Sequence, residues 1–174
     1  RPLNMRRYHE DLAVIMEIFN DAWSDNWGFV PMSPSELRHM AKALKPIVRP
    51  QSVAIAELDG APVAMAIGLP NVNEDGRLLP FGWAKLLWRL KVKTPKTARM
   101  PLMGVRKAYH GSMMGAALAI SVIDAIRRAQ KAIGVEGGEL SWILEDNLAM
   151  RRMIEQFGGV AYKTFRMYER SLQP

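Results

Sequence analysis

Hydrophobic and polar residues along this chain follow two periods, and these predict helices and strands in alternation. Apolar residues three or four positions apart predict helices over residues 9–22, 80–92 and 147–157, and another after Gly115 that carries Leu118, Val122 and Ile126 on one face. Apolar runs bounded by Gly, Asn and Asp predict strands over residues 3–8, 52–58, 61–69, 100–105, 139–144 and 160–170.

Two short motifs fix where elements begin and turn. Ser33-Pro34-Ser35-Glu36 is a capping box with proline at the first helical position, so a second helix should start here and end at Pro46. Asp59-Gly60 predicts a two-residue hairpin turn between two strands. The resulting order is β-α-α-β-β-α-β-α-β-α-β. We expect a single domain over residues 1–174, which begins with Arg1 and is compatible with the C-terminal part of a longer chain.

Composition narrows the chemistry. The chain has 174 residues and no cysteine, which excludes disulfides, thiolate metal sites and a cysteine nucleophile. Its three histidines are scattered, so the sequence predicts no metal site. It contains no apolar run of transmembrane length and no signal-peptide pattern, so we expect a cytoplasmic protein without a membrane partner.

Positive charge is concentrated in one segment. The net charge is +7, and residues 85–107 hold eight Lys or Arg without any Asp or Glu. Such a segment suits a polyanion, such as the phosphates of CoA, an acidic carrier protein or nucleic acid. It equally suits a solvated basic surface. Trp88 is the one aromatic residue between these cations, so the segment lacks a platform for stacking bases.

The most informative run is 105–118, where a predicted strand leads through a glycine-bearing loop into a helix. Free backbone N–H groups and the positive end of the helix dipole converge at such a junction, which favours a phosphate or pyrophosphate. The candidate anion-binding residues form one contiguous stretch: His110, Gly111, Ser112, Met113, Met114 and Gly115.

This run resembles the acyl-CoA binding segment of the GNAT acetyltransferase superfamily, in which a strand ending in valine leads to Tyr-Arg-Gly-x-Gly-x-Gly and a helix. Val105, Tyr109, Gly111 and Gly115 match that pattern. His110 stands where Arg or Gln is usual, and the glycine usual at position 113 is replaced by methionine. The resemblance implies an α/β fold with a mixed sheet, splayed central parallel strands and flanking helices, and it implies acetyl-CoA or another acyl-CoA as cofactor.

Two further segments carry the resemblance. The run 144–159 looks like the strand, asparagine, helix and glycine segment of the family, in which the residue at Asn147 commonly lies near the CoA arm. Asn147 is equally a helix cap and nothing more. The runs 23–31 and 80–83 look like an uncharacterised bacterial branch of GNAT-like proteins.

The resemblance also implies a mechanism. The strands 100–105 and 139–144 would splay apart, and a backbone N–H of Met103 or Val105 would polarise the thioester carbonyl while an amine attacks it directly. The connection between the first two helices would wall the acceptor site with Trp23, Asn26, Trp27 and Phe29. A loop packed back on the core explains these residues equally well.

Two proton transfers remain to be assigned. The tyrosine that the family often uses as acid is replaced by Ile154, so Tyr168, Tyr109 or water would protonate the leaving thiolate. Glu145 is the candidate base. Together with Asp146 it is equally a first-turn carboxylate that complements a helix dipole.

Three functions stay open at this point. The first is an acyl-CoA-dependent N-acyltransferase that acts on a small-molecule amine or works with an acidic carrier protein. The sequence is compatible with a monomer or a homodimer. The second is a degenerate GNAT domain that binds CoA or a partner without catalysis, which the residues at 110, 113 and 154 favour. The third is a nucleic-acid-binding module that uses the basic segment 85–107, and we rank it last.

Overall fold

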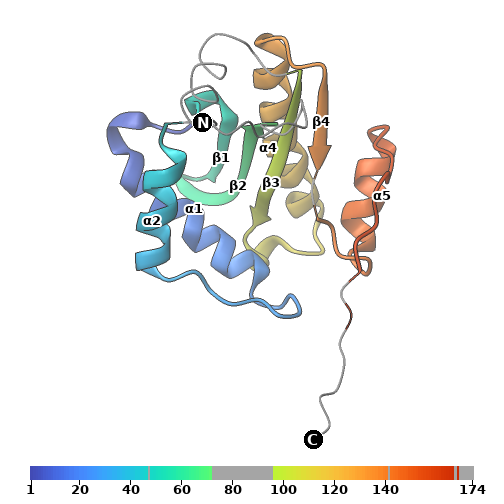
Figure 1. Ribbon diagram of the computed structural model, residues 1–174. Coiled ribbons are helices and arrows are strands. Elements are labelled where there is room, and N and C mark those ends of the chain that lie inside the picture. Colours follow the sequence, from blue (N-terminus) through green and yellow to red (C-terminus); the bar gives the residue numbers. More distant parts are fainter. Residues whose placement is uncertain (47, 72–95, 141, 167, 169–174) are drawn as a thin grey trace, which may run out of the picture. The chain divides into compact units, whose positions relative to one another are not determined.

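A computed structural model describes residues 1–46, 48–71, 96–140, 142–166 and 168 (Figure 1). The chain divides into two compact units, residues 1–141 and residues 142–174. The helix predicted over residues 80–92 and most of the basic segment 85–107 lie outside the described residues.

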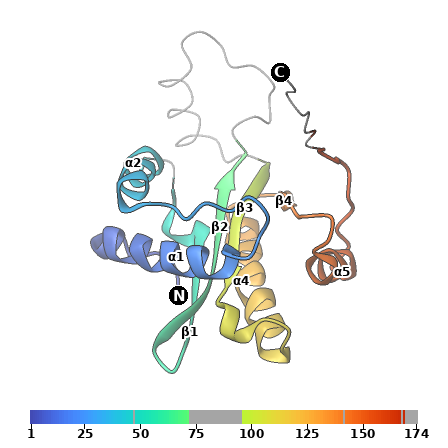
Figure 2. The same cartoon turned by 90° about the horizontal axis from the view of Figure 1, so that it is seen from below.

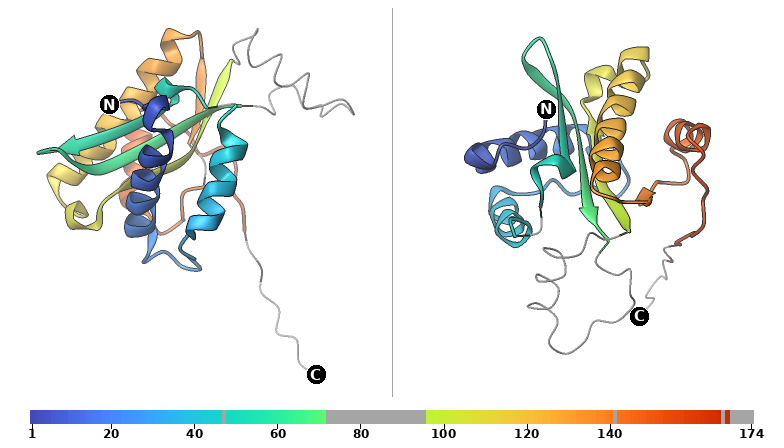
Figure 3. Two further views of the ribbon diagram at one scale, coloured as in Figure 1. Left: turned by 90° about the vertical axis from the view of Figure 1, so that its left-hand side faces the viewer. Right: turned by 90° about the horizontal axis from the view of Figure 1, so that it is seen from above.

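The first unit is built on a four-stranded mixed sheet (Figure 1). Its strands are β1 (Val53–Leu58), β2 (Ala61–Pro70), β3 (Thr97–Val105) and β4 (Gly137–Leu140), hydrogen-bonded in that order. The first two pairs are antiparallel and the last pair is parallel. The predicted hairpin is confirmed: Asp59 and Gly60 have φ values of 51° and 81°, the left-handed conformation that this turn needs. The hairpin projects from the sheet in Figure 3.

Helices cover both faces of the sheet (Figure 2). α1 (Tyr8–Trp23) and α2 (Pro34–Leu44) lie on one face, and α4 (Met113–Ala132) lies on the other. Ile15, Ile18 and Met65 are almost fully buried between α1 and the sheet. Each such side chain contributes roughly 1.5–3 kcal/mol by leaving water. The helical spacing of apolar residues noted in the sequence therefore marks the faces that hold this unit together.

The capping box that predicted α2 is present. The Ser33 hydroxyl accepts a hydrogen bond from the backbone N–H of Glu36, and the Glu36 carboxylate accepts one from the backbone N–H of Ser33. The Ser33 hydroxyl also donates to the Glu36 carboxylate, and this bond, together with the one from the backbone N–H of Ser33, holds the pKa of Glu36 below its usual value.

The strand predicted over residues 3–8 is wrong. Pro2 forms an isolated bridge with Ala54, and the chain then turns through a 3₁₀ helix, η1 (Met5–Arg7). The cause is a buried carboxylate: Asp11 accepts two hydrogen bonds from the Arg1 guanidinium, both of 2.9 Å, and one of 2.8 Å from the backbone N–H of Asn4. Burial alone would raise the pKa of Asp11, but these bonds hold it below its usual value.

The second unit contains α5 (Leu148–Gln156), close to the predicted range. The strand predicted over residues 160–170 is not formed in its described part, residues 160–166 and 168. Val160, Tyr162 and Phe165 are each more than half exposed there. An apolar alternation becomes a strand only where a neighbouring strand accepts its backbone hydrogen bonds, and the second unit offers no such neighbour among its described residues.

Candidate functional site

An irregularity in β3 opens the sheet. Ile67 of β2 pairs with Leu102, but Leu69 pairs with Arg99, so β3 carries one more residue than β2 over this stretch. The extra residue lies at Met100-Pro101, where β4 also stops pairing, since its register covers only residues 97–100 of β3. Proline has no N–H to offer a further strand. In the described part of the first unit, β3 therefore has no strand partner on its β4 side beyond Pro101.

The register of β2 and β3 shows which backbone groups face this opening. The N–H of Arg106 donates to the carbonyl of Val63 at 2.8 Å, so the residues at 104 and 102 also face β2. Met103 and Val105 alternate with them and turn their N–H and C=O groups away from β2. Neither N–H has a hydrogen-bond partner among the described residues. The two strand residues predicted to contact the thioester thus present donors to the same opening.

A tight turn connects the open end of β3 to α4. It contains a 3₁₀ helix, η3 (Lys107–Tyr109), and Gly111 with a φ of 69°. The Ser112 hydroxyl accepts from the N–H of Gly115 at 3.0 Å and donates to the carbonyl of Tyr109 at 2.7 Å. A Cβ atom at Gly115 would collide with that same carbonyl. Glycine is therefore required at position 115, because the turn folds directly onto the first turn of the helix.

The start of α4 meets the requirements of an anion site. The N–H groups of Met113 and Met114 make no hydrogen bond within the described part of the chain, and the first turn contains no acidic residue. Such N–H groups and the helix dipole attract negative charge. Met113 is 92% exposed at this helix start.

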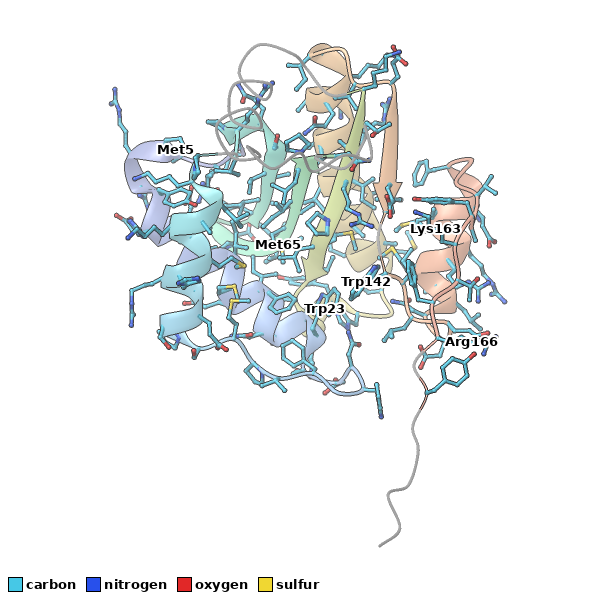
Figure 4. All side chains as sticks on the ribbon, in the orientation of Figure 1. Met5, Trp23, Met65, Trp142, Lys163 and Arg166 are labelled. Atoms are coloured by element: carbon cyan, nitrogen blue, oxygen red, sulfur yellow. The ribbon has the colours of Figure 1, made fainter. Side chains whose placement is uncertain are left out.

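Trp23 ties the end of α1 to the open strand (Figure 4). Its indole N–H donates to the outward carbonyl of Met103 at 2.9 Å. Phe19 lies between its ring and that of Phe29, with ring centroids 5.2 and 5.4 Å away. Of the four predicted acceptor residues, Trp23 and Phe29 thus join one aromatic cluster. The other two lie in the exposed turn that follows α1: Asn26 accepts from Phe29 N–H, and Trp27 is 75% exposed.

His110 contacts the second outward carbonyl. Its Nε2 atom lies 2.7 Å from the carbonyl oxygen of Val105. A carbonyl only accepts, so Nε2 carries the proton in this contact. The ring of His110 thus contacts the strand, and its predicted contact with a phosphate stays a prediction.

Asp21 is a residue that sequence reasoning missed. Its carboxylate accepts from the backbone N–H of Lys107 at 2.8 Å, which fixes the start of the turn to α1. The side chain of Lys107 pairs with Asp25 at 2.5 Å. No local pattern marks this anchor, because 86 positions separate the two residues.

The remaining predicted residues belong to the second unit. Asn147 caps α5, and its side chain accepts from the N–H of Met150 at 3.2 Å. Its predicted contact with the CoA arm stays a prediction. Glu145 is exposed, and its backbone carbonyl accepts from Arg151. The side chain of Tyr168 is 90% exposed. The roles of Glu145 and Tyr168 as base and acid stay predictions as well.

The described end of the basic segment is charge-compensated by residues distant in sequence. Arg99 pairs with Glu139 at 2.6 Å, and Arg106 pairs with Glu17 at 3.5 Å. With the pair of Lys107 and Asp25, three of its cations face a carboxylate. In this described end of the segment, carboxylates from other elements therefore offset part of the positive charge. Separately, no described helix has the length and apolar character needed to cross a membrane.

A groove of about 350 Å³ lies beside the connection between α1 and α2. Apolar side chains provide most of its lining, with one carboxylate and one imidazole: Val30, Pro31, Met32, Met40, Glu36 and His39.

The chain has relatives among curated proteins. It is 48% identical over 177 residues to the bacterial ceramide synthase of Caulobacter vibrioides, a match that covers 99% of this chain and 46% of that protein. It is 45% identical over 177 residues to Protein YghO of Escherichia coli, with 99% and 45% covered. The chain therefore spans somewhat less than half the length of these relatives. No family model matches it.

Solved structures share its architecture. AAC(6′)-Iy, in complex with the bisubstrate analogue CoA-S-monomethyl-acetylneamine, matches with a TM-score of 0.61 at 13% identity, over 98% of this chain and 96% of that one. An N-acetyltransferase from Staphylococcus aureus matches with a TM-score of 0.58 at 18% identity, over 91% and 80%. At these identities the likeness concerns the fold, and the resemblance seen in the sequence is confirmed at that level: the chain has the fold of the GNAT N-acetyltransferases.

Proposed function

We propose that this protein is an acyl-CoA-dependent N-acyltransferase. The observation that carries the proposal is the open side of β3 next to the capped start of α4. The N–H groups of Met113 and Met114 hold the pyrophosphate, and those of Met103 and Val105 face the pantetheine arm and the thioester carbonyl. Acyl-CoA supplies the activated acyl group, so no nucleophile from the protein is needed.

The chain's own residues then have two proton tasks. An amine must lose a proton to become a nucleophile, and the departing thiolate must gain one. We assign the first task to Glu145 and the second to Tyr168, with Tyr109 or water as the alternative donor. Support for the alternative is positional: Tyr109 lies in the turn itself, and its backbone carbonyl accepts from Ser112.

The relative in Caulobacter supports a long-chain amino alcohol as the acceptor. A ceramide is the amide of a long-chain amino alcohol, so a ceramide synthase forms the same bond that an N-acyltransferase forms. At 48% identity over 99% of the chain, the same acceptor class is the natural assignment. The apolar groove beside Val30 and Met40 suits the hydrocarbon chain of such an amine. An acceptor of this kind replaces the unspecified small-molecule amine expected from the sequence.

A thiol-release assay tests the proposal. The protein is mixed with acetyl-CoA or a long-chain acyl-CoA and with sphinganine, and the free CoA is quantified with a thiol reagent. Because the chain has no cysteine, every thiol detected comes from CoA. We expect turnover with sphinganine and much less with ethanolamine, which carries the same amino alcohol without the hydrocarbon chain.

Binding and chemistry are measured separately. Calorimetry with CoA reports the cofactor site, and mass spectrometry of the product reports amide formation. Absence of CoA binding would contradict the proposal as a whole. Tight CoA binding without amide formation from any amine would instead favour the degenerate GNAT domain.

One observation favours that second candidate. Ile154 occupies the position at which the family often has its acid, and it packs against Gly159, where a Cβ atom would collide with its side chain. The N–H of Gly159 also donates to the carbonyl of Ile154 at 2.9 Å. Ile154 thus lies in the last turn of α5, where it contacts the glycine that follows the helix, and it supplies no proton. A degenerate domain needs no replacement acid, whereas the enzyme needs Tyr168, Tyr109 or water.

A further inference from the structure

On the open side of β3, the backbone carbonyls are already hydrogen-bonded and the backbone N–H groups are not. A bare strand edge presents N–H donors and C=O acceptors in alternation. Beyond Pro101, the outward acceptors of β3 are the carbonyls of Met103 and Val105, and a side chain already bonds each of them. The indole N–H of Trp23 donates to the first at 2.9 Å, and the imidazole Nε2 of His110 donates to the second at 2.7 Å. The outward N–H groups of the same two residues have no partner among the described residues.

We propose that Trp23 and His110 are positioning residues that make the open edge of β3 a donor-only surface, so that an acyl-CoA arm is held through its carbonyl oxygens and its thioester is fixed in one register. This inference rests on the proposed function. It assigns to two side chains the task of aligning the thioester, which is separate from holding the phosphates.

Register is the quantity that these two side chains control. An extended arm with amide groups can pair with a strand edge in registers that differ by two residues, or about 7 Å along the strand. With both acceptors open, an amide N–H of the arm finds a carbonyl in either register. With both acceptors bonded internally, only carbonyl groups of the arm find partners, and the thioester contributes one of them. A thioester displaced by as little as 1 Å loses about a hundredfold in rate.

The elements that carry Trp23 and His110 support their role in aligning the thioester. Trp23 is the last residue of α1, and its ring packs on Phe19 in the helix that leads to the predicted acceptor wall. His110 precedes Gly111 in the turn that leads to the phosphate site. The hydrogen bond of Trp23 therefore connects β3 to α1, which leads to the predicted acceptor wall. The hydrogen bond of His110 connects β3 to the turn that leads to the proposed phosphate site.

Conservative variants remove the donors and keep the rings. Trp23→Phe and His110→Phe each lose the N–H that bonds the carbonyl. His9→Phe and His9→Gln serve as matched controls for the two kinds of substitution. His9 is exposed, and its ring nitrogens have no hydrogen bond within the described residues. His110→Gln retains a side-chain N–H and tests rescue.

The readouts are kcat, KM for acyl-CoA, and the dissociation constants of acyl-CoA and free CoA. We expect Trp23→Phe and His110→Phe to lower kcat by about tenfold to a hundredfold. Free CoA should bind with unchanged or higher affinity, because a newly open carbonyl accepts from the arm. The preference for acyl-CoA over free CoA should shrink, and His110→Gln should recover part of kcat. A purely structural role would leave that preference unchanged.

Three results would overturn the inference. The first is a kcat within twofold of the parent in both variants. The second is a loss of kcat that the controls share. The third is a parallel loss of affinity for acyl-CoA and free CoA with their ratio unchanged. Failure of the proposed function is distinguishable, because the parent protein itself would then bind no CoA or transfer no acyl group, and the inference would fall with it.

Discussion

The helices α4 and α5 begin with the same kind of cap, but the packing around the two helix starts differs. At α4 the side chain of Ser112 accepts from the N–H three residues later, and at α5 the side chain of Asn147 does the same. The third helical residue is Gly115 in α4 and Met150 in α5. Only at α4 does a preceding carbonyl, that of Tyr109, occupy the space of a Cβ atom. A cap alone thus marks a helix start, whereas a turn folded so closely that it requires glycine marks a candidate ligand site.

The largest effect should come from filling that space. Gly115→Val places side-chain atoms against the carbonyl of Tyr109, so the turn must open and the N–H groups of Met113 and Met114 must move. We expect CoA binding to fall by more than a hundredfold, together with a cost in stability of about 1–3 kcal/mol from overpacking. Calorimetry and thermal unfolding measure the two effects.

Met150→Val is the matched substitution at the third position of α5. It should change CoA affinity by less than twofold, because no turn folds onto that helix start. Equal losses in both variants would contradict the distinction between the two helix starts.

Removing the caps should separate stability from binding. Ser112→Ala and Asn147→Ala each leave an N–H without its acceptor, at a cost of about 1 kcal/mol in stability. Ser112→Ala also removes the hydrogen bond from the hydroxyl to the carbonyl of Tyr109, which keeps only the bond from the backbone N–H of residue 112, and it should weaken CoA binding by about tenfold, the value of roughly 1.4 kcal/mol. Isothermal calorimetry on both variants checks this. A comparable loss of CoA affinity in Asn147→Ala would show instead that Asn147 reaches the ligand.

Glycine is favoured at position 111 by the backbone conformation and not by a lack of space for a side chain. Its φ of 69° is left-handed, but no atom lies within 4 Å of a Cβ built on it. Gly111→Ala should therefore cost about 1 kcal/mol in stability. The expected loss of CoA affinity is below tenfold, much smaller than for Gly115→Val. The reverse order of the two variants would mean that the turn is held open by conformation and not by packing.

The smallest effect concerns the first residue of each helix. Met113 stands where the family usually has glycine, and Leu148 holds the corresponding place in α5. Met113→Gly removes a side chain at the phosphate site and should tighten CoA binding by about 1 kcal/mol. Leu148→Gly should only lower helix stability. Unchanged or weaker CoA binding in Met113→Gly, with the unfolding temperature preserved, would show that the methionine does not obstruct the ligand.

The elements that depend on residues close together in the chain could be predicted from the sequence. The capping box of α2, the Asp59-Gly60 turn, the apolar face of α1 and the run from Val105 to Gly115 each depend on neighbours within a few positions. The match of that last run to a known family also gave the fold. The strand predicted over residues 3–8 failed because Asp11, a residue outside it, draws the chain into a turn.

Contacts between distant residues were not predictable. The extra residue at Met100-Pro101 becomes visible only once β2 and β3 are paired. The bond from Trp23 to Met103 spans 80 positions, and Trp23 was predicted as a substrate contact from its place in the connection between the first two helices, as the family resemblance implies. In the described end of the basic segment, Arg99 and Arg106 likewise pair with carboxylates on elements that sequence spacing does not connect.

The opening beside Pro101 also bears on solubility. A strand without a neighbour is a template on which a strand of another molecule can add, and such additions lead to aggregation. Pro101 and the two bonded carbonyls remove half of the hydrogen-bonding groups that an added strand would use. The same substitutions that free those carbonyls should therefore make the ligand-free protein more prone to self-association, and CoA should protect it.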